Sequence, residues 1–338
     1  MRSAMISLPV EDESQIGMVR RAAMAAAKSV ELSPDDADRL AIIVTEASTN
    51  LIRHAKGGEI LVGTENGDST GVGAVVVVAI DSGPGIANVE AAMVDGFTTS
   101  DTKPHGIGGG LGSMKRLADS FDIYSSPHGT TVVVTVGQRS PNPSFYDVAG
   151  LIVPKPGFDK GGDAFQIRVG ETTTTVMLMD VLGHGPKAAR DADIGIEAFA
   201  KANSASLEGT EEAIANALAG GRGAAALLIE IPHEPGVIRC MGVGNIKGDV
   251  LHQDGRRNGI PSQPGILGAS ARRPRVTEHE WAQGSILLLA TDGLKTSSAQ
   301  PEPTSLLFRS AEMIASAVYK LKRRGTDDSG VLVVRSQQ

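Results

Sequence analysis

Residues 74–86 read AVVVVAIDSGPGI, an unbroken apolar run that leads directly into an acid and two glycines. A strand with no polar position is predicted to be covered on both of its faces. Asp81 stands where this strand ends, and Gly83 and Gly85 allow the backbone to approach a ligand closely. The stretch therefore predicts a buried strand that delivers a carboxylate to a binding site.

A helix is predicted upstream of this strand, with Ser33 as its N-cap and Pro34 at its first position. Glu46, Asn50 and His54 follow at intervals of four residues, so the three side chains project from one face of the helix. A carboxylate, a carboxamide and an imidazole in this order suit Mg²⁺ ligation and proton removal beside phosphates. A solvated polar face is the simpler alternative for this pattern.

Downstream of the strand, residues 106–112 read GIGGGLG and run into another predicted helix. Backbone amides at a helix N-terminus, without side chains in the way, form a cradle for phosphate. No strand is predicted directly before these glycines, which argues against a dinucleotide-binding fold. The polar stretch FTTSDT at 97–102 is typical of a lid, and Gly129-Thr130 opens the last strand of a hairpin.

The order Glu-x₃-Asn-x₃-His, Asp-x-Gly-x-Gly, glycine-rich lid and Gly-Thr resembles the Bergerat-fold (GHKL) ATPases and kinases over residues 5–137. Within that superfamily the chain is most similar to the RsbT-type switch kinases. The resemblance implies an α/β sandwich with helices on one face of a mixed sheet, and ATP with Mg²⁺ as cofactor. It implies that Asn50 holds Mg²⁺, that Asp81 reads adenine, and that Glu46 accepts the proton of a target serine hydroxyl. The other nucleotide-binding residues that it implies are His54, Gly83, Gly85, Ile86, Thr98, Thr99, Gly106, Gly108, Gly109, Gly110, Leu111, Gly112 and Thr130.

The composition changes at residues 139–145, where two prolines and small polar residues predict a linker between a domain at 1–138 and a domain at 146–338. Predicted strands outnumber helices beyond the linker, which favours an antiparallel sandwich flanked by helices. Acids recur where these strands begin or end, namely Asp163, Asp180, Asp292, Asp327 and Asp328. Acids are common turn formers at such places. Together, however, these oxygen donors suit two Mg²⁺ or Mn²⁺ ions better than zinc.

Gly-Gly-Asp, Asp-x₂-Gly-His-Gly, Ala-Thr-Asp-Gly and the final Asp-Asp resemble the PPM phosphatases of the SpoIIE and RsbX type over residues 146–336. The resemblance implies an αββα sandwich in which Asp180 bridges two metal ions. The metal ligands that it implies are Asp163 through a water, Asp180, the carbonyl of Val181, Asp292 and Asp327. Val243-Gly244-Asn245 also matches the family, as a tight loop that borders the site. Ser329-Gly330 departs from the family pattern, so Asp328 stays open as an alternative ligand.

The bulk composition excludes several other classes of protein. A net charge of −7 gives no basic footprint for nucleic acid or an anionic membrane. The one cysteine, Cys240, excludes an intrachain disulfide and fits a reducing cytoplasm. No apolar stretch approaches the roughly 20 residues that a membrane-spanning helix needs. We therefore expect a soluble cytoplasmic α+β protein of two domains.

The two resemblances together imply a bifunctional partner-switching regulator. It would act as an ATP-dependent protein serine/threonine kinase and as a metal-dependent phosphatase on STAS-type antagonist proteins, in stress or sigma-factor signalling. A downstream phosphatase or an anti-sigma component is a further expected partner. One alternative is that the first domain is a non-catalytic, ATP-dependent binding module fused to an active phosphatase. Another is that only the phosphatase works.

Overall fold

The computed structural model describes residues 3–66, 73–94, 110–139, 145–202, 206–269, 273–295 and 304–336. The chain divides into two compact units, Met1–Ser140 and Pro141–Gln338. Within the described ranges, no helix combines the length and the apolar character that a membrane crossing requires.

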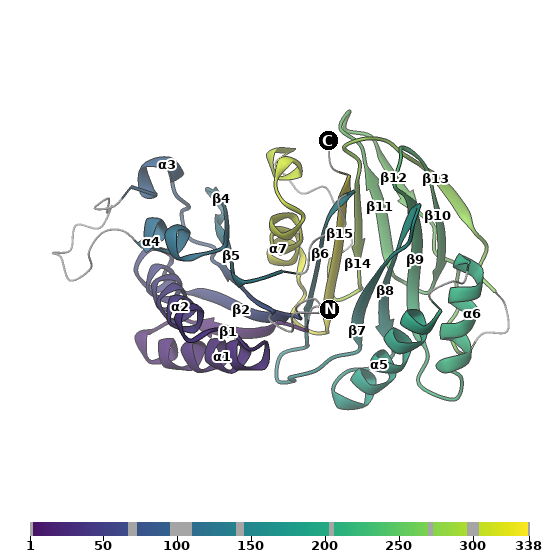
Figure 1. Cartoon of the computed structure of the whole chain (residues 1–338), viewed down its shortest axis with the longest axis horizontal. Helices are drawn as coiled ribbons and strands as arrows, with labels where there is room; N and C mark the ends of the chain where they lie inside the picture. Colours follow the sequence, from purple (N-terminus) through teal and green to yellow (C-terminus); the bar gives the residue numbers. More distant parts are fainter. Residues whose placement is uncertain are drawn as a thin grey trace. The chain divides into compact units, whose positions relative to one another are not determined.

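The first unit packs helices α1 and α2 against one face of a five-stranded sheet with the strand order β1-β2-β3-β5-β4 (Figure 1). Its elements in chain order are β1 (Ile6–Val10), a 3₁₀ turn (Glu13–Gln15), α1 (Ile16–Ser29), α2 (Pro34–Ala55), β2 (Gly58–Glu65), β3 (Ala74–Ile80), α3 (Val89–Ala92), α4 (Gly110–Leu117), β4 (Ser120–Ser126) and β5 (Gly129–Gly137). The helices cover one face, as expected. All four strand pairs described are antiparallel, however, so the expectation of a mixed sheet was wrong in this detail.

Helix α2 begins as its sequence predicts. The Ser33 hydroxyl accepts a hydrogen bond from the Asp36 amide at 3.1 Å, and Pro34 occupies the first turn. Lys56 ends the helix in the left-handed conformation, with its amide bonded to the Leu51 carbonyl. The buried stripe of this helix consists of Leu40, Ile43, Val44, Ala47, Ser48 and Leu51. Glu46 therefore lies on the side that the hydrophobic core leaves available.

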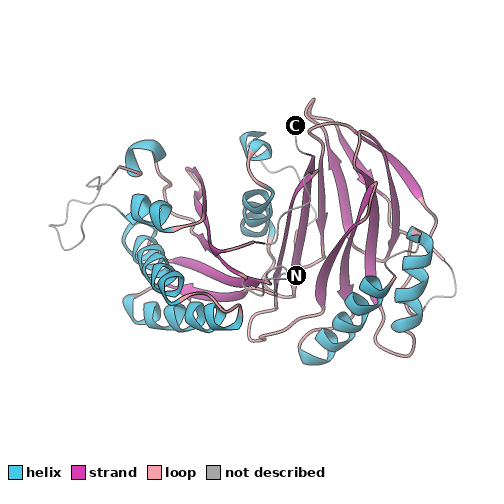
Figure 2. Cartoon of the chain, in the orientation of Figure 1, coloured by secondary structure: helices cyan, strands magenta, loops and turns pink. Residues whose placement is uncertain are grey.

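The second unit is a sandwich of two antiparallel five-stranded sheets, with the orders β13-β10-β9-β8-β7 and β12-β11-β14-β15-β6. Its elements are β6 (Tyr146–Val153), β7 (Asp163–Val169), β8 (Thr173–Val181), α5 (Pro186–Lys201), α6 (Leu207–Ala217), β9 (Ala224–Pro232), β10 (Gly236–Val243), β11 (Lys247–Leu251), β12 (Arg257–Ile260), β13 (Thr277–Trp281), β14 (Ile286–Ala290), a 3₁₀ turn (Thr304–Phe308), α7 (Ala311–Lys322) and β15 (Ser329–Ser336). Helices α5 and α6 cover the outer face of the first sheet and α7 that of the second (Figures 1 and 2). The expected αββα architecture is confirmed.

Strand pairing in the second unit brings the acidic motifs to common sheet ends. Asp163 and Asp180 are direct cross-strand partners at one end of the β7–β8 pair. Ala290 pairs with Val331, so the segment after β14 and the segment before β15 leave their sheet at the same end. The two sheets approach closely near this point, because a Cβ added at Gly150 would lie 2.3 Å from the Phe165 ring.

Candidate nucleotide and metal sites

The first candidate site begins on the polar face of α2. Glu46 and Asn50 are half-buried there, and α4 starts directly against them. A Cβ added at Gly110 would lie 2.9 Å from Oε2 of Glu46 and 3.3 Å from Oδ1 of Asn50. Glycine at this position therefore lets the N-terminus of α4 approach both side chains without displacing them. Two of the predicted motifs thus meet at one place.

Asp81 organises the adjoining loop after β3. Its Oδ1 accepts hydrogen bonds from the amides of Gly83 at 2.8 Å and Thr130 at 3.1 Å. The Asp81 amide in turn donates to the Thr130 carbonyl at 3.0 Å. Within the described ranges both side-chain bonds end on Oδ1, which leaves Oδ2 to accept from a ligand amine. The predicted role of Asp81 as a base reader fits this geometry.

Two glycines fix the position of this loop. Gly85 adopts φ 74°, and a Cβ at this position would lie 2.0 Å from the Ser126 carbonyl oxygen. A Cβ at Gly83 would lie 2.9 Å from Ala55, at the end of α2. The Ile86 amide donates to the Ser125 hydroxyl at 2.8 Å. The loop is therefore held between α2 and β4.

The structure describes only some of the remaining residues that were predicted for this site. Leu111 and Gly112 lie in the first turn of α4, where Leu111 packs against the core and Gly112 is buried. His54 is exposed near the end of α2, and no hydrogen bond from its ring to the other site residues is found among the described residues. Five predicted residues lie outside the described ranges, namely Thr98, Thr99, Gly106, Gly108 and Gly109.

The second candidate site is built around the cross-strand pair of Asp163 and Asp180. Asp163 is 6% exposed. Burial raises its pKa well above the usual value, and the neighbouring Asp180 raises it further. Burial is also the main reason that the pKa of Asp180 is raised to about 7. The neighbouring charges of Asp292, Asp327 and Asp328 raise it as well. Each of these acids is therefore close enough to others to repel them.

Asp292 and Thr291 occupy the turn that follows β14. Asn245 donates from Nδ2 to Oδ2 of Asp292 at 2.7 Å, so the loop after β10 borders the site. The Thr291 hydroxyl donates to Oδ2 of Asp163 at 2.7 Å and accepts from the Gly330 amide at 2.8 Å. Thr291 was not singled out from the sequence. Its signal is a buried hydroxyl (1% exposed) directly before a candidate ligand.

The two final acids have different surroundings. Asp328 is buried, and its two carboxylate oxygens accept from the amides of Lys155 and Gly162, each at 2.7 Å. Asp327 is exposed and accepts from the Asp328 amide at 2.9 Å. A Cβ at Gly161 would lie 2.4 Å from the Asp328 carboxylate. Asp328 therefore fastens the Gly-Gly-Asp segment to the last strand, whereas Asp327 remains available to a ligand.

The donor set fits divalent cations that prefer oxygen. Burial opposes the ionisation of Asp163 and Asp180, three further carboxylates lie within electrostatic range of Asp180, and positive charge is what offsets that cost. Among the described residues, no three acidic, cysteine or histidine side chains form a compact group that could hold a metal ion. A site for two ions spreads its ligands over a larger volume than one ion's shell, which is compatible with this looser arrangement. Val181 is fully buried, and its carbonyl lies 2.6 Å from a Cβ added at Gly162, so that oxygen faces the Gly-Gly-Asp loop.

Replacing Thr291 with Val is expected to destabilise the second unit by about 1–3 kcal/mol, because the substitution leaves the Gly330 amide and the Asp163 carboxylate without a buried partner. Thr291→Ser keeps the hydroxyl and serves as the matched control. Urea unfolding of the full chain checks this prediction. Equal stabilities of the two variants would contradict the bridging role.

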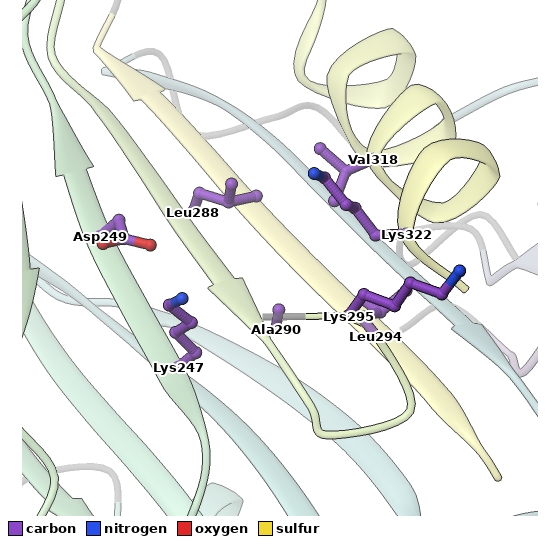
Figure 3. A pocket seen from close by; sticks show the side chains of 8 residues that line it. All are labelled: Lys247, Asp249, Leu288, Ala290, Leu294, Lys295, Val318 and Lys322. Carbon is purple, nitrogen blue, oxygen red and sulfur yellow. The ribbon is translucent and has the colours of Figure 1, made fainter. Parts of the chain in front are cut away.

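A small cavity elsewhere in the second unit does not contain any predicted site residue. It measures about 20 Å³ and lies between β11, β14 and α7 (Figure 3). Its lining residues are Lys247, Asp249, Leu288, Ala290, Leu294, Lys295, Val318 and Lys322. Asp249 forms a two-pronged ion pair with Arg257, at 2.9 and 2.7 Å. A volume that holds about one water molecule does not suit a substrate.

Comparisons with known proteins support both parts of this description. Residues 8–136 match the family described as histidine kinase-like ATPase domain, and residues 170–337 match the family described as stage II sporulation protein E (SpoIIE). The serine/threonine-protein kinase RsbT of Bacillus subtilis (strain 168) is 34% identical over 99 residues, which span 29% of this chain and 70% of RsbT.

Solved structures resemble a little over half of the chain. One, described as the bacterial stressosome, a modular system adapted to control secondary messenger signalling, has a TM-score of 0.51 and 26% identity; the match covers 56% of this chain and 99% of that one. A structure of RsbX in complex with magnesium has a TM-score of 0.52 and 18% identity, covering 58% of this chain and 98% of that one. The second likeness shows the fold alone.

Fold, sites and comparisons define a kinase-like ATPase domain fused to a domain of the PPM phosphatase fold. The chain belongs to the RsbT family through its first unit, and its second unit carries a SpoIIE domain.

Proposed function

We propose that the chain is a bifunctional switch that phosphorylates serine or threonine residues of a partner protein and removes such phosphates. The observation that carries the proposal is that each unit gathers oxygen-bearing side chains beside closely approaching glycine backbone. In the first unit these are Glu46 and Asn50 against Gly110, and in the second they are the carboxylates around Asp180.

In the kinase half, Asn50 would hold Mg²⁺ and Asp81 would accept a hydrogen bond from the adenine amine through Oδ2. Glu46 lies beside the start of α4, where the phosphates would rest on backbone amides. It would accept the proton of the target hydroxyl as phosphate transfer proceeds. Gly110 supports this assignment because no side chain separates the base from the phosphate cradle.

In the phosphatase half, Asp180, Asp292 and Asp327 would hold two Mg²⁺ or Mn²⁺ ions, together with the Val181 carbonyl. Bound ions would supply the activation of water and the charge neutralisation that phosphate-ester hydrolysis needs. Asp163, held by Thr291, would orient a water at the site. Asp328 would keep the Gly-Gly-Asp loop in place through its two amide contacts.

The partner that we propose is a STAS-type antagonist protein, as in partner-switching systems, and the compartment is the cytoplasm, where ATP is available. The RsbT family membership and the stressosome likeness support this choice. Incubation with ATP, Mg²⁺ and purified STAS-domain proteins, followed by phosphoprotein detection, tests it. ATP binding without any phosphate transfer would instead favour a non-catalytic binding module. Absence of ATP binding would favour the alternative in which only the phosphatase works.

The surroundings of the two final acids give a separate prediction. Asp327→Asn is expected to weaken Mn²⁺ binding about 10- to 100-fold with little change in the unfolding midpoint of the metal-free protein. Asp328→Asn is expected to lower that midpoint, because Asp328 accepts from two buried amides. Mn²⁺ titration and urea unfolding of both variants separate the roles. Reversed outcomes would assign Asp328 as the ligand.

A further inference from the structure

Arg222 stands in the loop between α6 and β9, next to the segment that follows Asp180. Its backbone amide donates to Oδ2 of Asp191 on α5 at 2.9 Å, which fixes the loop against that helix. The next residue, Gly223, accepts from the Leu182 amide at 3.1 Å. Arg222 is therefore held beside the segment that follows Asp180.

The guanidinium of Arg222 lies on that segment. Its Nη1 donates to the Leu182 carbonyl at 3.1 Å. A Cβ added at Gly183 would lie 2.7 Å from the same nitrogen, so the absence of a side chain there makes room for the guanidinium. Across the described part of the chain, this is the one hydrogen bond found for the guanidinium, and the residue is exposed. Several of its N–H groups therefore remain available to a ligand.

The negative charge of the site suggests a substrate-binding role for Arg222. The other four carboxylates of the second candidate site all lie within electrostatic range of Asp180. Two divalent cations would balance four of these five negative charges, while a phosphoserine group brings about two more. A guanidinium beside the segment that follows Asp180 would attract that group and match its oxygens with a planar fork of donors.

We propose that Arg222 binds the phosphoryl oxygens of the substrate phosphoserine or phosphothreonine in the second unit. This inference rests on the proposed phosphatase function and deepens it, because it names the residue that recognises the substrate phosphate. Arg222 contributes through substrate binding, whereas the acids hold the ions. A purely structural arginine, which only fastens Leu182, is the competing explanation.

Arg222→Gln separates the two explanations, because glutamine keeps an N–H donor for the Leu182 carbonyl and removes the charge. With a phosphoserine peptide and Mn²⁺, KM is expected to rise about 10- to 100-fold, with kcat changing much less. The inhibition constant of inorganic phosphate is expected to rise in parallel, while the unfolding midpoint stays at the wild-type value. Arg222→Lys is expected to have a KM between those of the wild type and Arg222→Gln.

Lys160→Gln is the matched control, since Lys160 is an exposed cation directly before the Gly-Gly-Asp loop. An equal effect of Lys160→Gln on KM would overturn the assignment to Arg222, as would unchanged KM and phosphate inhibition in Arg222→Gln. A lowered unfolding midpoint with unchanged KM would identify the structural role and also overturn it. Absence of hydrolysis by the wild-type chain in Mn²⁺ would instead contradict the proposed phosphatase function, and the inference with it.

Discussion

Asp180→Asn is expected to abolish phosphoserine hydrolysis and, at the same time, to stabilise the metal-free protein. Asp180 is partly buried among like charges, and burial followed by Asp292 raises its pKa to about 7. An acid whose pKa is raised by folding destabilises the folded state once it ionises, so the penalty grows as the pH rises from the ordinary pKa of 3.8 to about 7 and stays at its full size above that. Removing the charge at pH 8 is therefore expected to raise the unfolding free energy by on the order of 1–3 kcal/mol.

The same substitution is expected to remove most of the stabilisation that Mn²⁺ would give the wild-type chain, because the amide lacks the negative charge that we assign to metal binding. Thermal unfolding in chelator and in Mn²⁺, beside peptide hydrolysis, measures both effects. Asp193→Asn, an exposed position on α5, is the matched control and should change neither. Full hydrolysis by Asp180→Asn in Mn²⁺, or a loss of stability in chelator, would contradict the metal assignment.

Glu46→Gln is expected to lower phosphate transfer to a partner serine by about 10²–10⁴-fold. Glutamine has nearly the same shape and fits beside Gly110, but it cannot accept the proton of the attacking hydroxyl. ATP affinity, measured by calorimetry with Mg²⁺, is expected to change by less than about threefold, because the contacts that we assign to adenine and Mg²⁺ belong to Asp81 and Asn50.

The exposed Glu13→Gln provides a control of the same chemistry on the first unit. Transfer by Glu46→Gln at the wild-type rate would mean that another group accepts the proton. Loss of ATP binding in Glu46→Gln would mean that the side chain supports the nucleotide pocket rather than the chemical step. These outcomes are distinguishable because binding and transfer are measured separately.

Local signals in the sequence were sufficient to predict much of the fold. The cap at Ser33, the apolar stripe of α2 and the valine-rich β3 can each be recognised from the local sequence, without knowledge of tertiary contacts. Strands β1, β11, β12 and β13 were missed. All four have at most five residues, and β1, β12 and β13 lie at the edges of their sheets.

Less of the candidate sites than of the fold could be predicted from the sequence. The oxygen donors could be named from their positions beside strands, but their partners could not. Thr291 bridges Asp163 and Gly330, which are far apart in the chain, and Asp328 receives amides from Lys155 and Gly162. Such contacts depend on sheet register and on close glycine packing, which no local pattern encodes. The antiparallel order of the first sheet likewise follows from long-range pairing.

Label transfer from γ-labelled ATP to a purified STAS-domain protein, compared among three chains, tests the central claim most directly. The account predicts that Asp180→Asn accumulates labelled phosphoserine on the partner, that the wild type releases much of this label as inorganic phosphate, and that Glu46→Gln does neither. Equal retention of label on the partner by wild type and Asp180→Asn, or labelling by Glu46→Gln, would contradict it.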